Sequence, residues 1–150
     1  MAKFDTVNDA SWVVLGKLTL SGTSTVTTSW VDMQGYNSLD VAFLNATVTD
    51  AGTASGFTAK LQESDTVTAV SATDVATGDA VNATASVTTT LDTDDDKLSA
   101  VLGYIGGKRY VRVSATGTTL SDAVVYVVGR RSHSGLSQPN TIIGAATAAT

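Results

Sequence analysis

The sequence contains no cysteine, and this excludes disulfide bonds, thiolate metal sites and thiol nucleophiles. It also contains a single histidine, His133, and a single glutamate, Glu63, although these residue types supply many of the general acids and bases of enzymes. Charged residues make up only 15% of the chain, and the helix-favouring ones among them are scarce. Stability must therefore come from packing, strand pairing or assembly, and no catalytic residue is expected.

Long apolar runs are missing as well. No stretch approaches the ~20 apolar residues that span a bilayer, and the N-terminal Met-Ala-Lys-Phe-Asp lacks the apolar region of a secretion signal. The net charge of −5 and the pI near 4.5 create a field that repels nucleic acid phosphates and anionic membranes. We therefore expect a soluble protein without a cleaved signal, and neither nucleic acid nor a membrane as its partner.

The chain is instead rich in residues that favour strands. Its 150 residues suit one domain, and 25 of them are threonine, with abundant valine, alanine, serine and glycine around them. Roughly seven to nine short strands, with turn signals every ~8–12 residues, predict an all-β fold. We expect a single antiparallel β-sandwich, jelly-roll or immunoglobulin-like, over residues 11–131, with extended terminal arms at 1–10 and 132–150.

Period-two alternation places several strands and their buried side chains. The clearest strands are expected at 11–20, with a bulge at Gly16, at 39–43 and at 57–61, and a central strand covered on both faces at 123–128. The stretch 98–105 fits either a short strand or one helical turn. Six aromatic residues fall on apolar positions and are expected in the core: Trp12, Trp30, Phe43, Phe57, Tyr104 and Tyr126. Tyr36 and Tyr110 lie on turn or polar positions and are candidate interface anchors.

The segment 104–131 carries most of the positive charge. Five of the nine basic residues lie within it, and its two valine-rich stretches predict a β-hairpin. On adjacent strands of a hairpin these side chains would form a basic patch. Because the whole chain is acidic, an acidic protein surface is a better partner for such a patch than nucleic acid.

Three other groups of residues could have a catalytic or ligand-binding role, and each also has a purely structural explanation. The carboxylates at Asp92, Asp94, Asp95 and Asp96 could hold a hard cation, but their spacing lacks the glycine turn and distal glutamate of an EF-hand, which favours a solvated turn. His133 has no evident orienting partner. Glu63 and Asp65 are expected at the surface, and Gly106-Gly107 reads as a turn without the spacing of a phosphate loop. No metal site and no cofactor are expected.

Two segments are similar to a known family. One is Tyr104-Ile-Gly-Gly-Lys-Arg-Tyr-Val-Arg-Val with the later Val-Val-Tyr-Val-Val-Gly-Arg-Arg-Ser-His, and the other is Phe57-Thr-Ala-Lys-Leu-Gln-Glu-Ser-Asp-Thr. They resemble segments of decoration, cement or head-stabilising proteins of tailed bacteriophages. The resemblance covers about half of the chain and carries no catalytic residue. It implies a β-rich structural module that binds the outside of an icosahedral capsid, as a trimer or dimer, with arms that clamp adjacent capsid subunits.

By that resemblance, the partner is the major capsid protein, and the protein is made in the host cytoplasm and ends on the virion exterior. The expected contacts lie on the basic hairpin and the two terminal arms. The residues expected to make them are Lys108, Arg109, Tyr110, Arg112, Arg130, Arg131, Leu136, Ile142 and Ile143. Two alternatives remain open. One is a carbohydrate-binding or host-attachment module of a phage head or tail fibre, and the other is a metal-assisted enzyme using Asp92 to Asp96.

Overall fold

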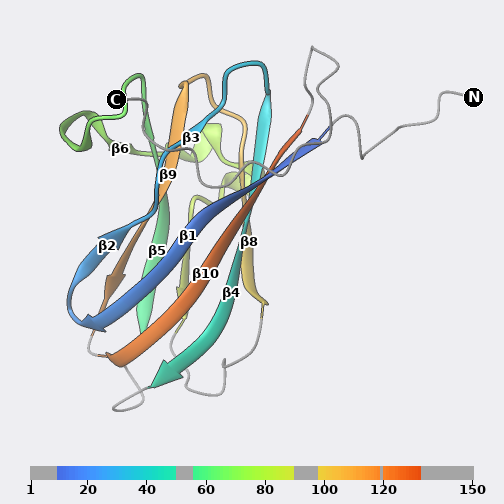
Figure 1. The fold of residues 1–150 in the computed structure, drawn as a ribbon. Helices are drawn as coiled ribbons and strands as arrows, with labels where there is room; N and C mark the ends of the chain where they lie inside the picture. The colour runs from blue at the N-terminus through green and yellow to red at the C-terminus, as the bar shows by residue number, and fades with distance from the viewer. Residues whose placement is uncertain (1–9, 50–55, 90–97, 119, 133–150) are drawn as a thin grey trace, which may run out of the picture.

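The computed structural model describes residues 10–49, 56–89, 98–118 and 120–132, and strands make up most of them. The strands, labelled in Figure 1, are β1 (Ala10–Gly22), β2 (Thr25–Thr27), β3 (Val31–Asp32), β4 (Ser38–Thr49), β5 (Phe57–Ser64), β6 (Thr73–Asp74), β7 (Ser86–Thr89), β8 (Leu98–Tyr104), β9 (Tyr110–Gly117) and β10 (Leu120–Ser132). Three single-turn 3-10 helices, η1 (Ala69–Ser71), η2 (Thr77–Asp79) and η3 (Val81–Ala83), join β5 to β7. Within the described ranges, no helix has the length and apolar character needed to cross a membrane.

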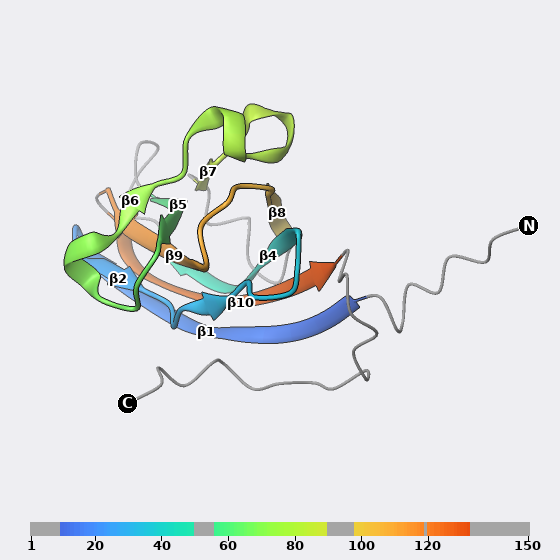
Figure 2. The ribbon, with the colours of Figure 1, turned by 90° about the horizontal axis from the view of Figure 1, so that it is seen from above.

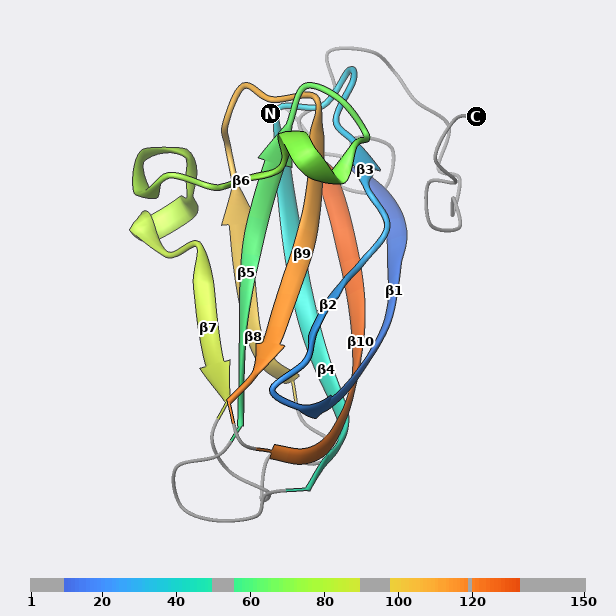
Figure 3. The same ribbon diagram turned by 90° about the vertical axis from the view of Figure 1, so that its left-hand side faces the viewer.

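The strands form two antiparallel sheets that pack face to face, so the predicted all-β sandwich is confirmed. Sheet A has the order β1-β10-β4-β8. Sheet B has the order β2-β9-β5-β6, with β3 also pairing with β9 and β7 with β5. The two layers are visible from above in Figure 2 and from the side in Figure 3.

The predicted hairpin of the basic segment is wrong, because β9 and β10 lie in opposite sheets. β9 pairs with β5 on one edge and with β2 and β3 on the other, whereas β10 lies between β1 and β4. Each strand therefore has both edges occupied and none left for the other. The inward side chains of the two strands instead meet in the core, and every one of the following is fully buried: Val111, Val113, Ala115, Ala123, Val125 and Val127.

The first strand contains the predicted bulge, and the bulge changes which residues face the core. The register with β10 shifts between Val14 and Gly16, where the backbone of Gly16 adopts a φ of 138° that favours glycine. Because of this shift, Leu18 is buried while Trp12, which shares its parity, is 48% exposed. The prediction that Trp12 lies in the core is therefore wrong.

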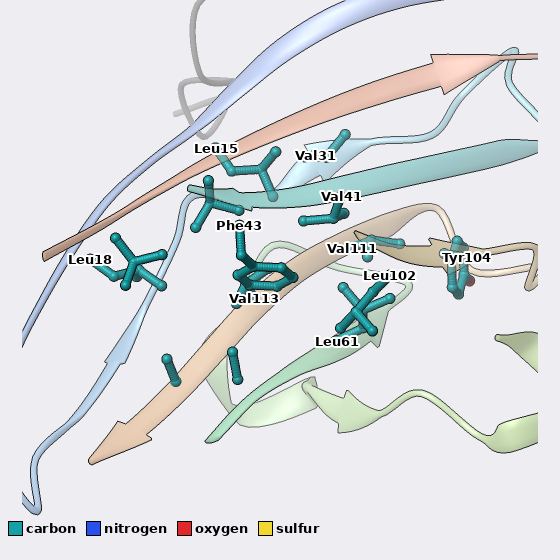
Figure 4. Packing of buried hydrophobic residues seen from close by; sticks show 14 of the residues in the cluster. Leu15, Leu18, Val31, Val41, Phe43, Leu61, Leu102, Tyr104, Val111 and Val113 are labelled. Atoms are coloured by element: carbon teal, nitrogen blue, oxygen red, sulfur yellow. The ribbon is translucent and has the colours of Figure 1, made fainter. Parts of the chain in front are cut away.

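The other predicted core aromatics divide in the same way. Trp30, Phe43, Phe57 and Tyr104 are buried, as expected, and Figure 4 shows Phe43 and Tyr104 among the aliphatic residues between the sheets. Tyr126 is 48% exposed, because it lies on the outer side of β10. β10 is central in its sheet, as predicted, but only its inner face is covered within the described structure.

One further predicted segment lies within the described residues and several lie outside them. The ambiguous stretch 98–105 is a strand, β8, and it pairs with β4. The predicted arms lie almost entirely outside the described residues, and so do Leu136, Ile142, Ile143 and His133. Asp92, Asp94, Asp95 and Asp96 also lie outside them.

Gly129 makes room for the core on the inner face of β10. A Cβ at this position would lie 2.7 Å from Leu15 Cδ1 and 3.0 Å from both Leu39 Cδ1 and Val13 Cγ1. We predict that Gly129→Ala lowers the free energy of unfolding by about 1–3 kcal/mol, as overpacking does in other cores. Urea unfolding would measure this loss. Gly78→Ala is the matched control, because no atom lies within 4 Å of its added Cβ, and an equal loss in both variants would contradict the packing argument.

Candidate functional site

One end of the sandwich collects most of the charged residues singled out by the sequence. We call it the basic end and define it by the β3–β4 turn, the β8–β9 loop and the last three residues of β10. The strand register brings these parts together, because Asp32 pairs with Tyr110, Leu39 with Tyr104, and Ser38 with Ser132. Ala10, the first residue of β1, pairs with Ser132 at the same end.

The predicted contact residues reach this end from both sheets. Lys108 and Arg109 lie in the β8–β9 loop, and Tyr110 begins β9 in sheet B. Arg130 and Arg131 lie near the end of β10 in sheet A and precede its last residue, Ser132. Arg112 lies two residues further along β9. The structure therefore brings these residues to one end by packing two sheets together, and not by the hairpin that the sequence suggested.

Asp32 is the charge partner of this end. Arg109 donates to its carboxylate from Nε (3.1 Å to Oδ1) and from Nη2 (2.9 Å to Oδ2), and also to Gln34 Oε1 at 2.8 Å. The backbone N–H of Gln34 donates to Asp32 Oδ1 at 2.9 Å. Burial raises the pKa of Asp32, but the hydrogen bonds from Arg109 and Gln34 and the positive charges of Arg109 and Arg131 outweigh it and leave that pKa below its ordinary value.

Arg131 binds the same residue from the other sheet. Its Nη1 donates to the main-chain oxygen of Asp32 at 2.7 Å, and its Nη2 donates to Ser11 Oγ at 3.2 Å. Its guanidinium also lies 4.3 Å from the centre of the Tyr36 ring, a cation–π distance. Only 8% of Arg131 is exposed, so this residue fastens β10 to β1 and β3 and offers almost no surface for docking.

The other cations of this region differ in their partners and in how much of each side chain is exposed. Lys108 pairs with Asp65 at 2.6 Å, and this hydrogen bond and charge raise the pKa of Lys108. Half-buried Arg112 donates to Gln62 Oε1 at 3.0 Å and covers the Trp30 ring at 4.5 Å. Lys108 and Arg109 remain close to half exposed, with 45% and 49% of their side chains accessible, and a partner can reach them.

An open cleft of about 600 Å³ lies at the basic end. One wall is the β3–β4 turn and the other is the β8–β9 loop. The lining combines apolar, amide and basic groups: Met33, Gln34, Tyr36, Asn37, Ile105, Gly106, Gly107, Lys108 and Arg109. Ile105 is 53% exposed there and gives the cleft an accessible apolar group. Such a lining suits an inserted loop or side chain of another protein.

Tyr104 and Glu63 form the floor beneath this loop. The Tyr104 hydroxyl donates to Glu63 Oε2 at 2.8 Å and accepts the backbone N–H of Lys108 at 2.9 Å. Burial, and then the hydrogen bond to Glu63, raise the pKa of Tyr104 far above its usual range. A Cβ on Gly106 would lie 2.7 Å from the Tyr104 ring, so glycine lets the loop pass closely over it. The predicted surface position of Glu63 is wrong, since it is 7% exposed; Asp65 is exposed as expected.

The groups brought together at this end are cations, carboxylates, a buried phenol and apolar side chains. In the described part of the chain, no three histidine or carboxylate side chains cluster as a metal ion would require. The sequence identified the cations here, but it did not identify Asp32, and it predicted a surface position for the buried Glu63. Nothing near Asp32 in the sequence indicates a partner 77 positions away.

Comparison with known proteins shows only distant likeness. No family model and no curated protein matches the sequence. Among solved structures, the chain is similar to a xylanase 10B of Clostridium thermocellum, comprising its CBM22-1 and GH10 modules complexed with xylohexaose. The TM-score is 0.39 at 9% sequence identity, and the match covers 90% of this chain but 28% of the xylanase chain. A likeness this distant carries no argument about function.

Removal of the Tyr104 hydroxyl tests the floor of the site. We predict that Tyr104→Phe lowers the free energy of unfolding by about 1–3 kcal/mol, because it leaves the buried Glu63 carboxylate without the donor that satisfies it. Urea unfolding at pH 7 measures this. Tyr110→Phe is the control, because no hydrogen bond of its hydroxyl is found among the described residues. Equal stability of Tyr104→Phe and the parent protein would contradict the assigned role.

The lowered pKa of Asp32 predicts a pH dependence. A carboxylate with a depressed folded pKa contributes stability above its unfolded pKa of about 3.9, and this contribution is lost as the pH falls through the folded value. Asp32→Asn should therefore be less stable than the parent by about 1 kcal/mol at pH 7, with the gap closing below about pH 4. Urea unfolding at several pH values between 7 and 2 would show it. Asp65→Asn serves as an exposed control, and a gap for Asp32→Asn that is independent of pH would argue against a charge effect.

Proposed function

We propose that this protein is a non-enzymatic structural protein of a tailed bacteriophage, which binds the outside of the icosahedral capsid and stabilises contacts between capsid subunits. One observation carries the proposal. The basic end gathers an open cleft, two half-exposed cations, the first residue of β1, Ala10, and the last residue of β10, Ser132. The resemblance of the strand segments to capsid decoration proteins adds to it.

The position of the chain ends gives the proposal its mechanism. Residues 1–9 and 133–150 continue from two paired positions at the basic end, so any contacts that they make begin beside the cleft. Loops at the ends of a β-sandwich commonly carry its binding function. On a capsid, one docked end with two adjoining segments would engage neighbouring subunits, and repetition around the shell would multiply weak contacts.

The partner surface can be described by the chemistry of the basic end. The proposed contacts are Ile105, Lys108, Arg109 and Tyr110, with Leu136, Ile142 and Ile143 from the C-terminal segment. Lys108 and Arg109 already bind Asp65 and Asp32, so acidic side chains of the major capsid protein would compete for or share them. Arg131 is left out of direct contact because it is buried.

A carbohydrate-binding or host-attachment module is the second candidate. It is favoured by the exposure of Trp12 and Tyr126, each 48% accessible on the outer face of sheet A. Exposed aromatic rings are amphipathic surfaces with a polar edge, which suits recognition. This candidate places binding on a different surface from the basic end, so variants separate the two.

Sedimentation with purified capsids tests the first candidate. The parent protein should bind at a fixed stoichiometry, and Ile105→Glu should weaken binding at least about tenfold, equivalent to about 1.4 kcal/mol, because it places a carboxylate in the cleft facing an acidic partner. Deletion of 137–150 should also weaken binding. Thr118→Glu is the control, since this exposed residue lies at the opposite end of the sandwich.

Two results would reject the proposal. One is that the parent protein does not bind capsids, and the other is that the Ile105→Glu and Thr118→Glu variants bind them equally. Binding to glycans that is lost in Trp12→Ala, without capsid binding, would establish the second candidate in its place.

A further inference from the structure

The outer face of sheet A is apolar over all four strands. It carries six large hydrophobic side chains that are 41–57% exposed: Trp12, Val14, Leu44, Leu98, Val101 and Tyr126. Single exposed hydrophobic residues are common on proteins, but a contiguous group of this kind marks an interaction surface.

Strand register places five of these six side chains in two adjacent rows, and it places Trp12 beside Arg130 in the row next to them. One row crosses the sheet through Val14, Val128, Ala42 and Val101. The next row crosses through Lys17, Tyr126, Leu44 and Leu98. Half-buried Arg130 and Asp40 lie side by side beyond the first row, on the two central strands. The apolar area is thus a stripe across the middle of the face, with charged residues beside it.

The outer face of sheet B is different in kind. A row across four of its strands consists of threonine alone: Thr25, Thr116, Thr58 and Thr88. The hydroxyls of Thr25 and Thr116 are 2.8 Å apart, and those of Thr58 and Thr88 are 3.1 Å apart. One side of the sandwich is therefore suited to water and the other to a protein surface.

The size of the apolar face suits a stable contact. About half of each of the six large side chains is exposed, which amounts to roughly 500 Å² together. With the polar residues that surround them, the face approaches the ~800 Å² per partner of a standard protein interface.

We propose that this face binds a second copy of the same chain, related by a two-fold axis that runs along the strands. Such an axis places β10 of one copy over β4 of the other at the same level. Arg130 then faces Asp40 of the second copy, and the reverse contact forms equally, because residues that pair across the two central strands exchange places. Val128 meets Ala42, and Tyr126 meets Leu44, along the centre of the contact.

The charges on the face favour self-association over a strongly charged partner. Among the described residues, its two cations, Lys17 and Arg130, are matched by two anions, Asp40 and Asp122, so the described face is neutral. No ion pair of Arg130 or Asp40 is found within the described part of the chain, although the two are neighbours on adjacent strands. Their charges therefore remain for a facing surface of the same pattern. The inference does not depend on capsid binding, which is proposed for the cleft and loops of the basic end and not for the outer face of sheet A.

Charge reversal provides the test. Arg130→Asp gives a face with Asp at both positions, and Asp40→Arg gives one with Arg at both. By sedimentation or light scattering, the parent protein should be a dimer, each variant alone should dissociate at least tenfold more readily, and an equimolar mixture should form heterodimers.

Lys60→Asp and Asp74→Lys are matched controls, because each reverses one charge of an ion pair of 2.6 Å on sheet B. Neither variant nor their mixture should alter the dimer. Val101→Glu, at a position 56% exposed, should also weaken the dimer.

Several results would overturn the inference. A parent protein that stays monomeric would do so, and so would a mixture of the two variants that stays monomeric although circular dichroism shows both to be folded. A monomer that binds glycans, or that binds capsids through Arg130 and Val101, would assign the face to that partner. If the protein stays monomeric but binds capsids, the proposed function is supported and the dimer is rejected. If the protein is a dimer that does not bind capsids, only the proposed function is rejected.

Discussion

The packing of β9 against β10 across the core is the interaction on which the rest of the structure depends. Both are central strands of their sheets, and their buried valine and alanine side chains hold the two layers together. β9 begins at the basic end and β10 ends there, so this packing brings Arg109 and Arg131 to the same residue. Asp32 receives one through its carboxylate and the other through its main-chain oxygen. A hydrophobic contact in the middle of the molecule thus sets the electrostatics at its end.

Much of the fold could be predicted because it depends on local patterns. The alternation through 39–43 and 57–61 specifies which side chains of β4 and β5 are buried, and those side chains are fully buried. The pattern fails where a residue is inserted, as at Gly16: the bulge reverses the faces of β1 and carries Trp12 outward. The pattern predicts Tyr126 in the core because a continuous apolar run has the same sequence pattern whether the outer face of the strand is covered or exposed.

The candidate site was predictable in its residue types but not in its construction. Clustering of Lys108, Arg109, Arg130 and Arg131 in the sequence indicated a basic region, and they do share one end of the sandwich. Their neighbours could not be inferred, because proximity along the chain suggested a hairpin, whereas competition for strand edges placed the two segments in opposite sheets. The partners Asp32 and Glu63 come from distant strands, and only the completed sandwich brings them near.

The pairing of Ala10 with Ser132 also determines how the sandwich responds to tension. β1 and β10 are antiparallel and are joined at the ends from which residues 1–9 and 133–150 continue. A force that pulls these two segments apart loads the ladder at one end and opens its hydrogen bonds one after another, as in a zipper. A force that pulls both in the same direction is shared by two long strands and by the core behind them. If the two segments were fixed to different subunits of an expanding shell, the β1–β10 seam would be the first part of the sandwich to yield.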